Sequence, residues 1–157
     1  MIPIGIVGYK MRFSVKSEYA VIAILDIALH ADKGPIHVRA IANRQAIPVR
    51  FLEQVMASLK KAGLVESIRG AQGGYVLSRD PGTINLAQVI EAIEGPITPM
   101  DCTAGLIDYR CLQINGCVVK DVWEDVRKAI TGVLSKVSIH EMCKRKREKE
   151  NPVMYHI

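Results

Sequence analysis

Residues 48–78 read PVRFLEQVMASLKKAGLVESIRGAQGGYVLS, and this stretch decides the fold. Its first part predicts a helix that ends near Gly63, because its apolar residues recur at helical spacing. Residues 64–68 then alternate as a strand, residues 69–74 form a polar, glycine-rich tip, and residues 75–78 read as the return strand. The apolar positions of the helix are Phe51, Leu52, Val55, Met56 and Leu59. We therefore expect a helix followed directly by a β-hairpin.

The segment before this stretch predicts two more helices. Apolar residues recur at helical spacing from Ser17, the expected N-cap, to Leu29. After a break at residues 33–35, a short helix is expected around residues 38–42, and residues 46–48 interrupt it. Two helices separated by a tight turn are typical of a helix-turn-helix, and a hairpin directly after it is a wing. The fold class is therefore mainly α with a small β-hairpin wing.

Residues 118–137 form the longest periodic segment of the chain. An apolar stripe runs along about five turns of the predicted helix, through Val119, Val122, Trp123, Val126, Ile130, Val133, Leu134 and Val137. So small a domain has little core left to cover this stripe. We expect a long C-terminal dimerisation helix that pairs with the same helix of a second copy. Folding of the stripe onto its own domain remains the alternative.

The same patterns divide the chain into six parts. We expect an N-terminal extension (1–10), a winged-helix domain (11–80), a connecting helix (81–97), a cysteine-containing loop (98–117), the dimerisation helix (118–137), and a short last helix with a basic tail (138–157). Ser138 and Glu141 have the spacing of a capping box at the start of that last helix.

Composition limits the class of protein. The chain has 157 residues, 49% of them hydrophobic, which suffices for one core with an appendage. No apolar run is long enough to span a bilayer, and the N-terminus lacks the pattern of a secretory signal. We expect a cytoplasmic protein with reduced thiols. The net charge is +5, but residues 144–150 account for +3 of it, so charge alone is weak evidence for a nucleic-acid partner.

Candidate DNA contacts lie on the second helix of the helix-turn-helix and on the wing. Arg50, Glu53 and Gln54 fall between its buried positions, and Arg and Gln can make bidentate contacts with bases. Arg69 at the glycine-rich tip suits a narrow minor groove. An ordinary solvated face would explain the polar residues of the helix as well.

Nothing in the sequence predicts an enzyme. The four histidines are scattered, and no serine or cysteine has an activating neighbour. The glycines of residues 70–74 lie between two strands instead of opening a helix, so they do not predict a nucleotide-binding loop.

Three of the four cysteines gather in one irregular segment. Cys102, Cys111 and Cys117 are soft thiolate ligands of the kind that bind iron-sulfur clusters, zinc or copper(I). Their spacing is looser than the paired Cys-x-x-Cys of structural zinc sites. An iron-sulfur cluster, zinc, and reduced or redox-exchanging thiols all remain open from spacing alone. We expect Cys143, on the polar last helix, to be incidental.

Several ordered motifs resemble the Rrf2 superfamily of bacterial winged-helix transcription regulators, of the IscR, NsrR and CymR types. They are residues 11–14 with 19–20, then 51–54, 63–65, 68–70, 73–75 and 94–96. The resemblance covers residue 11 to about residue 137, and it is strongest to the three-cysteine members that bind an iron-sulfur cluster.

The resemblance implies a homodimer that binds double-stranded operator DNA. It places the DNA contacts at Pro48, Val49, Arg50, Glu53, Gln54, Arg69 and Gly70, with the helix in the major groove and Arg69 in the minor groove. It also implies a cluster held by Cys102, Cys111 and Cys117, with 2Fe-2S favoured over 4Fe-4S.

The fourth ligand departs from one pattern of the family. Members similar to IscR carry a histidine three residues after the third cysteine, where this chain has Lys120. In other members an acidic residue in the first helix of the partner chain is the ligand, and the matching position here is Glu18.

Two functions therefore remain from the sequence. The first is a regulator that senses iron-sulfur, redox or nitric oxide status through its cluster and controls iron-sulfur assembly or sulfur-metabolism genes. The alternative is a cluster-free, CymR-like regulator of cysteine metabolism that acts through an enzyme partner and has zinc-bound or structural cysteines.

Overall fold

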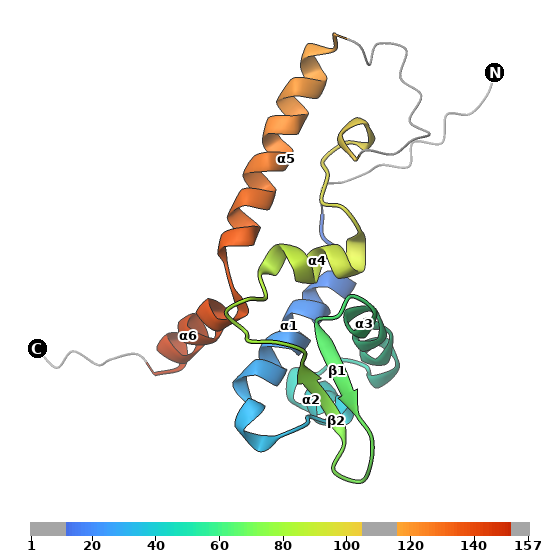
Figure 1. Ribbon diagram of the computed structural model, residues 1–157, viewed down its shortest axis with the longest axis vertical. Coiled ribbons are helices and arrows are strands. Elements are labelled where there is room, and N and C mark those ends of the chain that lie inside the picture. Colours follow the sequence, from blue (N-terminus) through green and yellow to red (C-terminus); the bar gives the residue numbers. More distant parts are fainter. Residues whose placement is uncertain (1–11, 105–115, 152–157) are drawn as a thin grey trace, which may run out of the picture.

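The computed structural model describes residues 12–104 and 116–151, and Figure 1 shows how they are arranged. In chain order the elements are α1 (Val15–Leu29), η1 (Ala31–Lys33), α2 (Val38–Gln45), α3 (Val49–Lys61), β1 (Val65–Ile68), β2 (Gly74–Leu77), α4 (Leu86–Glu94), η2 (Asp101–Thr103), α5 (Val118–Lys136) and α6 (Ile139–Glu150). The expected fold class, mainly α with a small β-hairpin wing, is confirmed. Within the described ranges, no helix is long and apolar enough to cross a membrane.

Helix α1 lies at the centre of the core, where it contacts α2, α3, α4, α6 and β2. Its Ala20, Ala23, Ile24 and Ile27 are at most 1% exposed, and they pack with the fully buried apolar face of α3, which is Leu52, Val55, Met56 and Leu59. Burial of this kind stabilises the fold by roughly 1.5 to 3 kcal/mol for each large aliphatic side chain.

The start of α1 differs from the expectation. Ser14, not Ser17, is the N-cap, and its hydroxyl accepts a hydrogen bond from the Ser17 N–H at 3.3 Å. Ser17 lies inside the first turn and is 1% exposed. The expectation was wrong because a serine three residues upstream can satisfy the same free amides, and apolar spacing does not distinguish the two.

A buried carboxylate fixes α2 against α1. Asp26 is 1% exposed and accepts hydrogen bonds from Arg44 Nε (3.1 Å), Arg44 Nη2 (2.5 Å) and Gln45 Nε2 (2.8 Å). Burial opposes ionisation of Asp26, but the hydrogen bonds from Arg44 and Gln45 and the charge of Arg44 outweigh it and lower its pKa. The first helix of the helix-turn-helix is therefore held in place by a charged, directional contact.

The turn between α2 and α3 is tight. Ala46 ends α2 in the left-handed conformation (φ +52°, ψ +40°), and its N–H bonds to the Ala42 carbonyl. At the far end of α3, Gly63 has φ +70° and follows the C-cap Ala62, as the sequence predicts.

The wing is anchored to the chain that enters α2. Strands β1 and β2 pair antiparallel, with Val65 opposite Leu77 and Ile68 opposite Gly74. Ile36 adds a bridge, because its N–H donates to the Tyr75 carbonyl (2.9 Å) and its carbonyl accepts a hydrogen bond from the Tyr75 N–H (2.8 Å). A Cβ at Gly74 would lie 2.5 Å from the Ile36 carbonyl carbon, so only glycine allows this close approach.

The junction between α5 and α6 is hydrogen bonded to the chain that enters α4. The Leu86 N–H donates to the Val137 carbonyl (2.9 Å), and the Ile139 N–H donates to the Ile84 carbonyl (2.8 Å). Both Ile84 and Ile139 are fully buried. These two hydrogen bonds join the C-terminal end of α5 to the core of the winged-helix domain.

Helix α6 is less peripheral than its polar sequence predicts. Its N-cap Ser138 accepts the Glu141 N–H at 3.1 Å, as expected for one half of a capping box. Cys143 is 5% exposed in the main core, and burial raises the pKa of its thiol, so it is a core residue of this helix. The two buried residues of α6, Ile139 and Cys143, gave too weak a periodic signal among its eight charged residues.

The apolar stripe of α5 has two different surroundings. Ile130 and Leu134 pack on a second cluster formed by Ala87, Ile90 and Ile97, so this part folds onto its own chain. Three valines of the stripe, Val119, Val122 and Val133, stay exposed by 56–65%, and the adjacent Val118 is 73% exposed. The stripe is therefore shared between the domain itself and a surface that remains open on α5.

Candidate nucleic-acid interface and cysteine segment

The N-terminal half of α3 carries the predicted base-reading residues. Arg50, Glu53 and Gln54 are all exposed, while the opposite face of the helix is buried in the core. Pro48 is the exposed N-cap and Val49 is half-buried in the first turn. One edge of α3 thus presents a cation, an anion and an amide, a set that can contact base edges and phosphates.

The wing tip forms a second, separate part of this candidate surface. Arg69 and Gly70 directly follow β1 and are exposed, and Gly70 has φ +112°. Figure 1 shows the tip projecting beyond the helices. Lys60 of α3 donates to the Ser67 hydroxyl at 2.5 Å, which joins the wing to the C-terminal end of α3.

Two helix N-termini of the helix-turn-helix lack a side-chain cap. The N-cap residues are His37 for α2 and Pro48 for α3, and neither side chain bonds to the first turn. Free amides at a helix N-terminus favour anions such as phosphate. Pro48 is among the expected DNA contacts, whereas His37 is not, although the lack of Ser, Thr, Asp or Asn directly before each helix can be seen in the sequence.

The cysteine segment, which runs from Cys102 to Cys117, begins and ends beside α5. Cys102 lies in η2 and is half-buried, and Cys117 is the half-buried N-cap of α5. Contacts join η2 to α5. Cys111 lies outside the described residues. Both described thiols of the predicted set are free and accessible, unlike the core residue Cys143.

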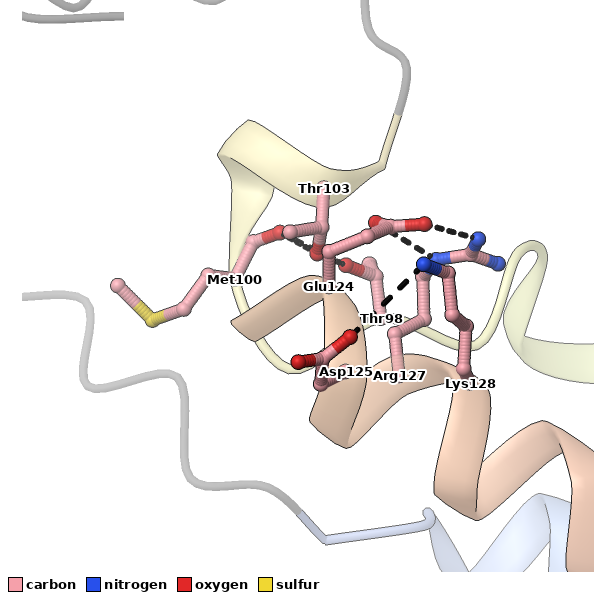
Figure 2. Close-up of polar contacts among 7 residues, drawn as sticks. All are labelled: Thr98, Met100, Thr103, Glu124, Asp125, Arg127 and Lys128. Atoms are coloured by element: carbon pink, nitrogen blue, oxygen red, sulfur yellow. Dashed lines mark hydrogen bonds and ion pairs between the residues drawn. The ribbon is translucent and has the colours of Figure 1, made fainter. Parts of the chain in front are cut away.

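Polar contacts order the turn around Cys102. Figure 2 shows Thr98 and Thr103 converging on the Met100 carbonyl, to which their hydroxyls donate at 2.7 and 2.8 Å. Below this turn, Glu124 and Arg127 of α5 form a two-pronged ion pair with N···O distances of 2.5 and 3.1 Å. The turn that carries the first cysteine is thus a defined structure placed over α5.

A carboxylate ties the end of α4 to the start of α1. Glu94 Oε1 accepts the Ser14 N–H at 2.7 Å and the Ser17 hydroxyl at 2.6 Å. Glu94 is an exposed residue whose partial desolvation opposes ionisation, but these hydrogen bonds outweigh that effect and lower its pKa. Glu18, the predicted fourth ligand, is exposed in the same first turn of α1.

The described residues fit part of a cluster site. No group of three His, Cys, Asp or Glu side chains within residues 12–104 and 116–151 is arranged to hold a metal ion. Two of the three predicted thiols lie within these ranges, and both are free, partly accessible and adjacent to the same helix. Thiolates in this setting have the chemistry that iron-sulfur clusters require.

The polar networks of Asp26 and Glu94 were not predicted from the sequence. Asp26 and Glu94 each accept hydrogen bonds from residues far along the chain, which no local pattern indicates. For Asp26 the signal was a carboxylate within an otherwise apolar helical face. For Glu94 it was a carboxylate that ends a helix before Gly95, within a motif used only for the family resemblance.

Comparisons with known proteins are consistent with this geometry. Residues 13–145 match the family model Rrf2, described as an iron-dependent transcriptional regulator. The chain is 39% identical over 134 residues to the HTH-type transcriptional regulator IscR of Xenorhabdus nematophila, which covers 85% of this chain and 80% of the relative.

Solved structures show the same likeness. IscR from T. potens aligns with a TM-score of 0.74 and 37% identity, covering 97% of this chain and all of the other. CymR, the global cysteine regulator of B. subtilis, aligns with a TM-score of 0.72 and 30% identity, covering 85% of this chain and 97% of the other.

Proposed function

Because this chain belongs to the Rrf2 family of DNA-binding transcriptional regulators, we propose that it regulates transcription in response to an iron-sulfur cluster. The observation that carries the proposal is the cysteine segment. Cys102 and Cys117 lie free and accessible at its two ends, both beside α5. The relatives are transcription regulators, and the chain is not an enzyme.

The proposed DNA contacts use both parts of the interface. Arg50, Glu53 and Gln54 on α3 read bases in the major groove, with Pro48 and Val49 at the groove edge. Arg69 and Gly70 at the wing tip enter the minor groove. The exposure of these residues supports the assignment, since all but the half-buried Val49 are open to solvent.

The proposed dimer forms through the open half of the α5 stripe. Val118, Val119, Val122 and Val133 leave exposed apolar side chains along one long helix. A second copy presents the same surface, so a two-fold pairing buries both together. Two recognition helices in a fixed relation then match two half-sites about one turn of DNA apart.

Cys102, Cys111 and Cys117 would hold the cluster, with Glu18 of a second copy as the fourth ligand. When bound, a cluster of this kind supplies a centre that responds to oxidation and to nitric oxide, with 2Fe-2S favoured over 4Fe-4S. The protein's own part is to bring three thiolates together and to connect them to α1 and α5. Such control suits genes of iron-sulfur assembly or sulfur metabolism.

A second candidate function rests on the likeness to CymR. The fold of this chain matches B. subtilis CymR nearly as well as it matches IscR from T. potens. Lys120 also occupies the position where IscR-like members have a histidine. In this alternative the chain regulates cysteine metabolism without a cluster, through an enzyme partner.

Anaerobic purification distinguishes the two functions. We expect visible absorption with iron and acid-labile sulfide in the wild-type protein, and their loss in Cys102→Ala and Cys117→Ala. Cys143→Ala is the matched control, because this thiol lies in the core and should leave the colour unchanged. A colourless wild-type protein without iron or sulfide would contradict the proposal and favour the cluster-free regulator.

A further inference from the structure

The start of α1 and the end of α4 meet at one carboxylate. Figure 1 shows the chain entering α1 beside the chain that leaves α4. Glu94 is the last residue of α4, and Gly95 (φ +79°) turns the chain away directly after it. Glu94 Oε1 accepts both the Ser14 N–H and the Ser17 hydroxyl, at 2.7 and 2.6 Å.

This contact joins the two segments that carry the proposed cluster ligands, which are the cysteine segment and the first turn of α1. Along the chain, Glu94 is followed by the segment that holds Cys102 in η2. Ser17 immediately precedes Glu18 in the first turn of α1. A displacement of the cysteine segment therefore reaches the start of α1 through the end of α4.

The contact is directional, unlike the packing around it. Val21, Ile90 and Ile130 belong to the apolar cluster where α1, α4 and α5 meet, and such contacts tolerate small sliding motions. Hydrogen bonds to a carboxylate fix distance and angle, and they are about twice as strong as neutral ones. The negative charge also lies at the N-terminus of α1, where the helix dipole favours it.

Ser17 makes the contact sensitive to loss. The residue is 1% exposed, and its hydroxyl proton is donated to Glu94. If α4 moves away, this buried hydroxyl loses its partner, whereas the exposed Ser14 amide can bond to water instead. The position of α1 thus depends on the position of the end of α4.

We propose that Glu94 is the positioning residue that transmits the state of the cysteine segment to the DNA-binding domain, through Ser14 and Ser17. The inference rests on the proposed cluster-dependent function. Glu94 belongs to neither the proposed DNA contacts nor the proposed ligand set, so its removal should keep those residues in place and remove only the link between them. The centre of the domain moves with α1, because α1 packs on α3.

Thermodynamic linkage makes this disconnection measurable in both directions. If the cluster changes the affinity of the protein for its operator by some factor, the operator must change the affinity of the protein for the cluster by the same factor. Typical coupling factors are about 5 to 150. Without the Glu94 contact, both factors should fall to about one.

The test compares the dissociation constants of cluster-loaded and cluster-free dimers for one operator duplex, selected from genomic fragments with the wild-type protein. The variants are Glu94→Ala and Ser17→Ala, with Glu91→Ala as the matched control one turn earlier on the same helix. We expect the ratio of the two dissociation constants to be about 5 or more in the wild-type protein and similar in Glu91→Ala. In Glu94→Ala and Ser17→Ala it should lie within about twofold of one. Iron-chelator titration with and without operator gives the reciprocal factor.

The outcomes separate this inference from the proposed function. If Glu94→Ala folds poorly, Ser17→Ala supplies the variant that lacks the contact, and its ratio should still fall to within about twofold of one. Glu94→Gln keeps an acceptor oxygen, so its ratio should stay above that of Ser17→Ala. A purely structural role would lower thermal stability and leave the ratio at its wild-type value, and this result would overturn the inference alone. A wild-type protein that holds no cluster would overturn the inference and the proposed function together.

Discussion

Removal of the Asp26 carboxylate should destabilise the helix-turn-helix strongly. Asp26→Ala leaves the Arg44 guanidinium and the Gln45 amide without their acceptor. Breaking one side of a buried ion pair typically costs about 3 to 5 kcal/mol. The Arg44 side chain is 36% exposed and regains water, so we expect the lower end, about 3 kcal/mol.

Three variants measured by urea unfolding at one fixed protein concentration test this value. Arg44→Ala leaves a buried carboxylate without its cation and should cost about as much as Asp26→Ala. Asp26→Leu combined with Arg44→Met replaces both charges with apolar groups and should cost less than either single change. Single variants within about 1 kcal/mol of wild type would refute the reasoning, and so would a double variant whose cost equals the sum.

The same contact predicts a pH dependence with a defined sign. The pKa of Asp26 is lowered in the folded state, so the folded protein keeps this group ionised at pH values where the unfolded chain protonates it. The stabilisation is present above the ordinary aspartate pKa and is lost as the pH falls through the folded value. Thermal unfolding followed from pH 6 downward should show a smaller acid dependence in the Asp26→Leu, Arg44→Met double variant.

Three further perturbations have separate readouts. Gly74→Ala should destabilise the protein by about 1 to 3 kcal/mol in thermal unfolding, because its Cβ would overlap the backbone of Ile36, and an unchanged melting temperature would contradict the geometry. Arg69→Ala should weaken operator binding by roughly 1 to 3 kcal/mol in a gel-shift titration with the fold intact, whereas unchanged affinity would remove it from the interface. Val122→Glu with Val133→Glu should give folded monomers in light scattering, since both side chains are open in the single chain, and a persistent dimer would place the interface elsewhere.

The sequence predicted elements whose signal is local and repeated. The apolar period of residues 51–59 and the glycine-rich tip of residues 69–74 each match the observed α3 and wing. Residues 118–137 predicted α5 to within one residue. These predictions succeeded because helical and strand periods depend only on near neighbours.

Features set by tertiary contacts could not be predicted in the same way. Ser14 replaces Ser17 as the N-cap, because Ser17 is drawn into the core and bonds to Glu94. The stripe of α5 is divided by α4, which covers Ile130 but leaves Val122 open. No single-helix pattern states which neighbour will cover which part of an apolar face.

A hydrogen bond from Leu86 to Val137 fixes the C-terminal end of α5 to the winged-helix domain, and Ile130 and Leu134 pack on α4 next to it. The 19 residues of α5 extend about 28 Å from the Leu86–Val137 contact at 1.5 Å per residue. A rotation of α5 by about 10° about this contact would move its N-terminal end, where Cys117 lies, by about 5 Å, roughly the rise of one helical turn. Such a rotation would be magnified at the cysteine segment, and a displacement of Cys117 would in turn reach the winged-helix domain as a small change of angle.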